Sequence, residues 1–175
     1  MNRTIILTVA TTLLISVAGC DKSNAQQSAS TETSAQETEP NAWFLTSAPE
    51  GAISITAAKS NHQEGDEVVV RGRIGGRHSP ISSESSVFTV VDLELAFCGE
   101  HEEDGCTTPW DYCCETSGTI TNNSATIQVV GVDSIDPIAA GLKPLDEVIL
   151  IGVVGPRPTD EVFTILATGV YRAGG

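Results

Sequence analysis

The chain has 175 residues, and its 23 acidic against 9 basic residues give a formal net charge of −14 at pH 7. Contacts from lysine and arginine to phosphate dominate nucleic-acid affinity, so a chain this acidic is not expected to bind nucleic acid. β-Branched residues and glycine are frequent, and no long segment has the apolar spacing of an amphipathic helix. The composition therefore predicts a protein built mainly from β-strands.

The start of the chain has the features of an export signal. Arg3 supplies a positive charge, and residues 5–17 form an apolar run that is too short to span a bilayer. The run ends in four residues that resemble the signal of bacterial lipoproteins, an aliphatic residue, two small residues and a cysteine: Val17, Ala18, Gly19 and Cys20. The resemblance implies cleavage before Cys20 and attachment of a diacylglyceryl group to its sulfur, which would anchor the protein to a membrane. An ordinary signal peptide with a chance cysteine is the alternative.

The segment after this cysteine, residues 21–40, lacks any large apolar side chain. Such a segment cannot bury enough surface to offset its conformational entropy, so it is predicted to be a disordered tether. The chain is therefore expected to comprise a signal peptide at 1–19, a lipidated N-terminus and tether at 20–40, and one folded domain at 41–175.

Five segments of the domain alternate between apolar and polar residues or are apolar on both faces, as β-strands do. They are expected at residues 67–75, 86–97, 125–132, 146–155 and 161–173. Only short helices are expected, around residues 136–141 and 41–46. Because the last two strands are apolar on both faces, the sheet is expected to be closed or nearly closed.

The order of these strands resembles the OB-fold, as found in small bacterial exported proteins and in anticodon-binding-like domains. The matching residues lie in the first, second and fourth strands: Gly65, Asp66, Val68, Val70, Gly72 and Ile74, then Phe88, Val90 and Asp92, then Asp146, Val148, Leu150, Gly152 and Val154. The resemblance covers residues 64–173 and implies an all-β fold with a small five-stranded OB-like β-barrel; another small barrel or a sandwich is the alternative. Gly72 and Gly152 are expected to permit the bulges or coiling that close such a sheet.

The chain departs from this pattern between the second and third strands, where residues 98–124 form a cysteine-rich insertion. It holds four cysteines: Cys98, Cys106, Cys113 and Cys114. An even number of cysteines in an exported domain suggests disulfides. Because a bond between the adjacent Cys113 and Cys114 is geometrically awkward, the expected bridges join Cys98 and Cys106 each to one member of that pair.

A metal site is a second interpretation of the insertion. Cys98 and His101 are separated by two residues, and Cys106 with Cys113 or Cys114 would complete a set of four ligands. Thiolates with one imidazole suit zinc or copper(I), and no other cofactor is predicted. A thiol-redox role is a third interpretation, although no Cys-x-x-Cys pair is present and the nearby carboxylates would raise the thiol pKa values.

Two further groups of residues are candidates for ligand contact. Trp110, Asp111 and Tyr112 would form a stacking platform for a sugar or peptide, or a hydrophobic plug that seats the insertion on the barrel. Arg71 and Arg73 alternate onto one face of the first strand, where they would hold an anion or pair with the surplus carboxylates.

The sequence contains no Gly-x-Ser-x-Gly motif, no phosphate-binding glycine loop and no pattern around its histidines that indicates a catalytic nucleophile. It favours a non-enzymatic envelope lipoprotein that faces the periplasm or the exterior, with an OB-like domain in a ligand-binding or accessory role. A metal-binding or thiol-redox protein centred on the cysteines is the alternative. The membrane, reached through the lipid anchor, is the expected partner, and the sequence identifies no protein or small-molecule ligand.

Overall fold

The computed structural model describes residues 42–83, 85–100, 105–132 and 135–174. The predicted signal peptide, the lipidated Cys20, the tether and His101 lie outside these residues. Among the residues that are described, no helix is both long enough and apolar enough to cross a bilayer. The helices and strands all fall between Ile53 and Gly174.

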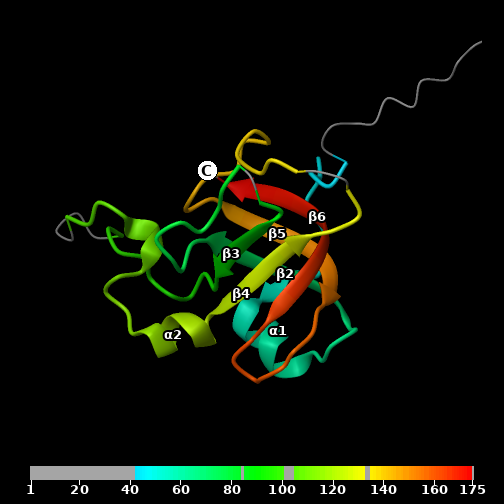
Figure 1. The fold of residues 1–175 in the computed structure, drawn as a ribbon, viewed down its shortest axis with the longest axis horizontal. Helices are drawn as coiled ribbons and strands as arrows, with labels where there is room; N and C mark the ends of the chain where they lie inside the picture. Colours follow the sequence, from blue (N-terminus) through cyan, green and yellow to red (C-terminus); the bar gives the residue numbers. More distant parts are fainter. Residues whose placement is uncertain (1–41, 84, 101–104, 133–134, 175) are drawn as a thin grey trace, which may run out of the picture. The chain divides into compact units, whose positions relative to one another are not determined.

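Five strands close a barrel (Figure 1). They are β2 (Glu67–Ile74), β3 (Val87–Val91), β4 (Ser124–Val129), β5 (Glu147–Val154) and β6 (Thr164–Gly174). The strands are neighbours in the order β2-β3-β4-β6-β5, and β5 pairs back onto β2. These pairings are antiparallel except for that of β4 with β6, which is parallel. This is the strand order of the OB-fold, so the predicted all-β, five-stranded OB-like barrel is confirmed.

A short segment before the barrel forms two elements that the sequence did not reveal. β1 (Ile53–Ser54) pairs in parallel with β2 and leads directly into α1 (Ile55–Asn61). Ser54 caps this helix, because its Oγ accepts a hydrogen bond from the backbone N of Ala57 at 3.2 Å. Ile55 and Ala58 are both 0 % exposed, so α1 packs its apolar face onto the barrel core.

The core is built by alternation along the strands. In β2, Val68, Val70 and Ile74 are buried, whereas Arg71 is exposed and pairs with Glu147 of β5 at 2.6 Å. Burying one large apolar side chain stabilises a fold by about 1.5–3 kcal/mol, and every strand of the barrel contributes such side chains. The largest fully buried ones are Trp43, Tyr112, Phe88, Ile55, Ile74, Ile127, Leu142, Leu150 and Ile165.

Gly72 and Gly152 have the role that their positions in β2 and β5 predict. A Cβ on Gly152 would collide with the backbone of Leu166, and the pairing of β5 with β6 shifts register between Ile151 and Gly152. A Cβ on Gly72 would lie 2.9 Å from the backbone oxygen of Val91. Both glycines therefore allow the close backbone approach that a strongly coiled barrel requires.

The second predicted strand is shorter than expected. β3 ends at Val91, whereas the apolar pattern extends to residue 97. Asp92 is the reason: its carboxylate is 1 % exposed and its Oδ1 accepts a hydrogen bond from the backbone N of Glu94 at 3.1 Å, which turns the chain away from the sheet.

Neither of the two predicted helices forms. Residues 136–141 form hydrogen-bonded turns without a helix, with Ala140 N donating to Asp136 O at 3.0 Å and Gly141 N to Ile138 O at 2.9 Å. Within 41–46, the part that the structure describes pairs with the barrel instead, because Phe44 forms a parallel bridge to Val170 of β6. In both places tertiary contacts to the barrel outweigh a weak local helix preference.

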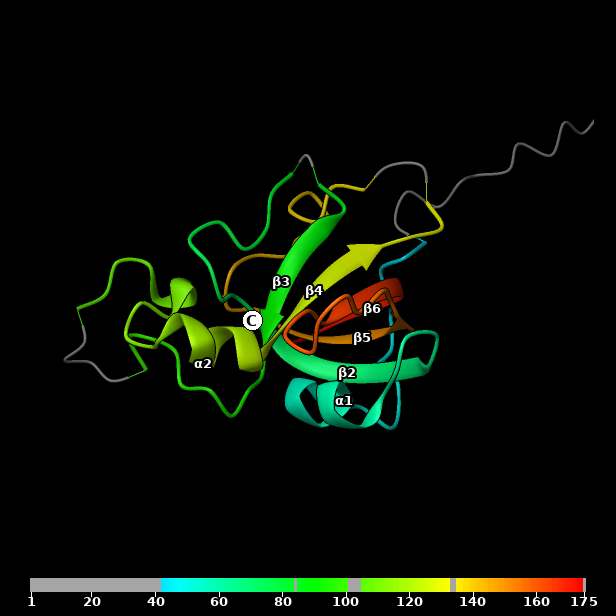
Figure 2. The ribbon, with the colours of Figure 1, turned by 60° about the horizontal axis from the view of Figure 1, so that its bottom comes forward.

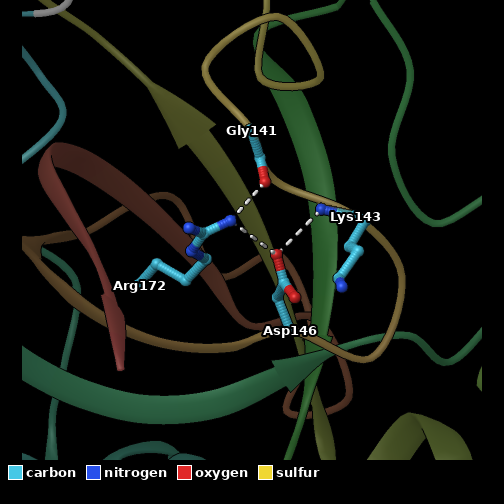
Figure 3. A network of polar contacts seen from close by, with 4 residues as sticks. All are labelled: Gly141, Lys143, Asp146 and Arg172. Atoms are coloured by element: carbon cyan, nitrogen blue, oxygen red, sulfur yellow. Dashed lines mark hydrogen bonds and ion pairs between the residues drawn. The ribbon is translucent and has the colours of Figure 1, made fainter. Parts of the chain in front are cut away.

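The connection from β4 to β5 is fixed by a small polar network (Figure 3). Asp146 is 1 % exposed, and its Oδ2 accepts a hydrogen bond from Lys143 N at 3.0 Å. Arg172 of β6 donates from Nη1 to Gly141 O at 2.7 Å and lies 4.0 Å from the same carboxylate oxygen. The network therefore ties this connection to the C-terminal strand.

The connection from β3 to β4 contains the cysteine-rich insertion, as predicted. It carries the 3-10 turn η1 (Pro109–Asp111) and the helix α2 (Ser117–Asn122). Thr116 caps α2, since its Oγ1 accepts a hydrogen bond from Thr119 N at 3.1 Å. Figures 1 and 2 both show the insertion projecting from one side of the barrel.

Candidate metal centre

The insertion is seated on the barrel at two glycines that follow β2. Gly76 N donates a hydrogen bond to Trp110 O at 2.8 Å, and Trp110 donates from its indole Nε1 to His78 O at 2.9 Å. A Cβ on Gly75 would lie 2.8 Å from both Trp110 O and Cε2 of Tyr112. Because Gly75 has no side chain, the backbone of the insertion can approach the barrel closely at this point.

Tyr112 fixes the direction of the chain immediately before Cys113. Its side chain is 0 % exposed, and its backbone is left-handed, with φ 57° and ψ 38°, a conformation that non-glycine residues adopt at a cost. Burial raises the pKa of its phenol, and the nearby Arg73 guanidinium offsets part of that rise. The buried ring therefore acts as a plug beneath the insertion, and the left-handed turn reverses the chain into Cys113.

The sulfur atoms of three cysteines converge above this plug. Cys113 Sγ lies 3.5 Å from Cys98 Sγ and 3.5 Å from Cys106 Sγ. A disulfide has a sulfur–sulfur distance of about 2.05 Å, so no bond joins these sulfurs. No disulfide is present among the cysteines that the structure describes, and the bridges expected from Cys98 and Cys106 to the adjacent pair are not formed in it.

The same separations suit a metal ion. In a tetrahedral zinc site with Zn–S bonds of about 2.3 Å, neighbouring sulfurs lie about 3.8 Å apart. The Sγ atoms of Cys98, Cys106 and Cys113 and a carboxylate oxygen of Asp111 all lie within 4.8 Å of one another. Three thiolates and one carboxylate in this arrangement could hold a thiophilic cation in fourfold coordination. We refer to these four residues as the Cys/Asp cluster.

The Cys/Asp cluster runs from the interior to the surface of the insertion. Cys98 is buried, Cys106 is half-buried and Cys113 is exposed. Cys114 N donates a hydrogen bond to Cys98 Sγ at 3.3 Å, a contact that orients this sulfur and stabilises its thiolate. The exposed sulfur of Cys113 leaves one side of the cluster accessible from solvent.

Hydrogen bonds among the cysteines shift the pKa values of Cys98 and Cys113 in opposite directions. Burial raises the pKa of Cys98, but hydrogen bonds from Cys114 and from the thiols of Cys113 and Cys106 outweigh it, so this pKa lies below its ordinary value. Hydrogen bonding to Cys98 first, and then to Cys106, raises the pKa of Cys113 far above its ordinary value. Cys98 is therefore the thiolate that the site stabilises when no cation is present.

Asp111 is held as an ionised carboxylate. Its Oδ2 accepts a hydrogen bond from Thr108 Oγ1 at 2.8 Å, and its Oδ1 accepts one from Cys113 N at 2.9 Å. These hydrogen bonds, that of Thr108 first, lower the pKa of Asp111. The sequence pattern favours Asp111 as part of a stacking platform or a hydrophobic plug and does not group it with the cysteines, although it lies two residues before Cys113.

The other predicted site residues lie around this centre or away from it. Arg71 is on the outer wall of the barrel in its ion pair with Glu147. Arg73 lies beside the insertion, with its guanidinium 4.8 Å from the centroid of the Phe97 ring. Trp110 is half-buried and is held by its hydrogen bond to His78, whereas the ring of Tyr112 has no face open to a ligand.

Comparisons with known proteins give structural likenesses without a family. No protein-family model matches the chain, and no curated protein matches it. Among solved structures, the hypothetical protein YgiW from E. coli is 15% identical, with a TM-score of 0.38 over 74% of this chain and 98% of that one. An OBody, AM1L10, solved bound to hen egg-white lysozyme, is 16% identical, with a TM-score of 0.41 over 75% of this chain and 99% of that one. The telomere capping protein Ten1 from Saccharomyces pombe is 11% identical, with a TM-score of 0.35 over 71% and 84% of the two chains.

Proposed function

We propose that this protein is a metal-binding envelope lipoprotein whose OB-like domain holds a zinc or copper(I) ion at the Cys/Asp cluster. The observation that carries the proposal is the convergence of three sulfurs and one carboxylate oxygen within 4.8 Å of one another. The sulfur separations of 3.5 Å are too long for disulfides and close to those of a tetrahedral thiolate site.

The ligand types favour a soft cation. Cysteine thiolates select Zn²⁺ and Cu(I) over the hard cations Ca²⁺ and Mg²⁺, which prefer sets made of oxygen ligands. Asp111 is the one oxygen donor of the cluster, and a single carboxylate beside three sulfurs does not make a calcium site.

The layout of the cluster supports metal handling in preference to catalysis. A catalytic zinc keeps an open coordination position for water or substrate, whereas four protein ligands complete a tetrahedral site. Cys98 is buried, so it holds one side of the site in place. Cys113 is exposed, so metal ions can enter and leave the site at this residue. The domain would therefore store or pass on a metal ion without acting as an enzyme.

The proposed location follows from the sequence. A lipid on Cys20 would place the protein on a membrane of the bacterial envelope, and residues 21–40 would let the domain reach away from that surface. Thiols in an oxidising compartment tend to form disulfides, and a bound metal ion protects them from oxidation.

Metal titration tests the proposal. The protein is purified under reducing conditions and titrated with Zn²⁺, and separately with Cu(I), against a chromophoric chelator. We expect one ion to bind per chain. Cys113→Ser should weaken the metal affinity by more than about tenfold, because it removes the sulfur that lies beside the sulfurs of both other cysteines of the cluster. Glu115→Gln is the matched control, since it changes a nearby charge outside the cluster. Equal affinities for Cys113→Ser and Glu115→Gln would contradict the proposal.

A further inference from the structure

A second candidate site lies at the opposite end of α2 from the cysteines. A cleft of about 540 Å³ opens between α1, the C-terminal end of α2 and the loop that joins β5 to β6. These three segments lie side by side in Figures 1 and 2. The residues that line the cleft are all polar or charged. They are the two cations Lys59 and Arg157, the acid Asp160, and Thr56, Ser60, Gln63 and Asn122.

Both cations are held in fixed positions by backbone carbonyls. Lys59 Nζ donates to Thr121 O and to Glu161 O, each at 2.8 Å, and so joins α1 to the other two walls of the cleft. Arg157 Nη1 donates to Lys59 O at 3.0 Å and to His62 O at 2.7 Å. The Arg157 guanidinium also lies 5.2 Å from the centroid of the Phe163 ring.

Neither Lys59 nor Arg157 forms an ion pair with a described residue. The ion pairs found among the described residues are Arg71–Glu147 and Arg172–Asp146, and neither involves Lys59 or Arg157. Burial first, and the charge of Arg157 second, lower the pKa of Lys59, and the charge of Glu161 offsets part of that shift. In so acidic a protein, two adjacent cations that form no ion pair make a site that a bound anion would complete.

Unused hydrogen-bond donors face the same cleft. Within the described chain, the Nε and Nη2 groups of Arg157 donate no hydrogen bond, and neither do the side-chain amides of Asn122 and Gln63. A guanidinium edge, an ammonium and amide N–H groups are the donors that phosphate oxygens accept from. Asp160 also lines the cleft, so a compact anion fits it better than an extended polyanion.

We infer that this cleft binds a phosphate group, either free phosphate or that of a small phosphomonoester, between Lys59, Arg157 and Asn122. The cleft exceeds the volume of a single phosphate group, and its hydroxyl and amide lining suits a polar remainder. The inference is independent of the metal site, because no member of the Cys/Asp cluster lines the cleft.

Titration of the isotope-labelled protein with inorganic phosphate tests the inference, with glycerol 3-phosphate as the second arm and sodium chloride at equal ionic strength as the background. We expect saturable shifts of the backbone amide signals of Ser60, Gln63 and Asn122 with at least one of the two ligands. Comparing the affinities for inorganic phosphate and glycerol 3-phosphate shows whether the cleft prefers free phosphate or a phosphomonoester.

Asn122→Asp is the informative variant, because the structure gives the Asn122 side chain no hydrogen bond whose loss would unfold the domain. The added negative charge should weaken binding at least about tenfold, while Gln128→Glu, an equal charge change on an exposed residue of β4, should leave it unchanged. The inference would be overturned if neither ligand saturates the signals, or if Asn122→Asp and Gln128→Glu bind phosphate equally well.

Discussion

Thr56 donates two hydrogen bonds to one oxygen of Asp92, from its backbone N at 2.9 Å and from its Oγ1 at 2.8 Å. Thr56 lies in the first turn of α1, and Asp92 is the first residue after β3, where the long connection to β4 begins. The contact therefore joins the helix that covers the core to the base of the segment that carries the cysteines.

This contact predicts an acid-sensitive contribution to stability. Burial raises the pKa of Asp92, but hydrogen bonds, those from Thr56 first, lower it by more, so the net pKa lies below its ordinary value of about 3.9. A carboxyl group with a depressed pKa in the folded state stabilises the fold above its unfolded pKa, and that stability is lost as the pH falls through the folded pKa. Asp92→Asn should therefore lower the free energy of unfolding by about 1.5–3 kcal/mol at pH 7 and by less in acid.

Urea denaturation at neutral pH and in acid checks this prediction. Glu94→Gln provides the control, since Glu94 is exposed and only its backbone N contacts Asp92. A destabilisation by Asp92→Asn that stays the same in acid would show that charge at this position is irrelevant.

The close contact between the insertion and the barrel at Gly75 gives a second prediction. Gly75→Ala should destabilise the domain by about 1–3 kcal/mol, because the new Cβ would press on Trp110 O and on the Tyr112 ring. Zinc affinity should fall as well, since Tyr112 directs Cys113 into the cluster. Gly118→Ala is the matched control: it lies in α2, the nearest atom to its added Cβ is 3.9 Å away, and alanine favours a helix. Unchanged thermal stability and zinc affinity in Gly75→Ala would refute this account of docking.

The carboxylate of the cluster gives a third prediction. Asp111→Asn keeps an oxygen that can accept the hydrogen bond from Cys113 N but removes the negative charge. Zinc affinity, measured by competition with a chelator, should drop about tenfold or more if the carboxylate is a ligand or orients one. The same change at Glu115 should have little effect. Affinities that are indistinguishable from the unmodified protein in both variants would remove Asp111 from the site.

The proposed anchor gives a fourth prediction, which depends on the sequence alone. Cys20→Ser removes the sulfur that would carry the lipid, so the protein should move from the membrane fraction to the soluble fraction after cell lysis. The fractions are compared by immunoblotting, with Cys114→Ser as the control because that cysteine lies in the folded domain. Membrane retention of Cys20→Ser would argue against lipidation.

The barrel could be predicted from the sequence because strand alternation survives in the linear pattern. Buried Val68, Val70 and Ile74 are two or four residues apart, and the pattern shows which face of β2 points inward without any tertiary information. The early end of β3 could not be predicted in this way, because Asp92 is buried only through its hydrogen bonds to a distant helix. α1 was missed since its seven residues include only two that are buried, too few for a helical period to stand out.

The sequence identified the cysteines as candidate metal ligands, but it did not show that Asp111 lies among them. The spacing of Cys98 and His101 suggested a ligand pair, and it contains no information about Asp111. The position of Asp111 among the cysteines arises from the left-handed backbone at Tyr112 and from the close approach at Gly75, and both depend on where the insertion meets the barrel. Spacing along the chain cannot show such a contact.

X-ray absorption at the zinc edge tests the metal-binding account most directly. The protein is purified anaerobically, loaded with one equivalent of Zn²⁺ and freed of excess ion. The account predicts a shell of sulfur scatterers at about 2.3 Å that dominates the spectrum, with one lighter scatterer at about 2.0–2.2 Å. A shell made only of light scatterers, or a protein that retains no zinc while its thiols are reduced, would contradict it.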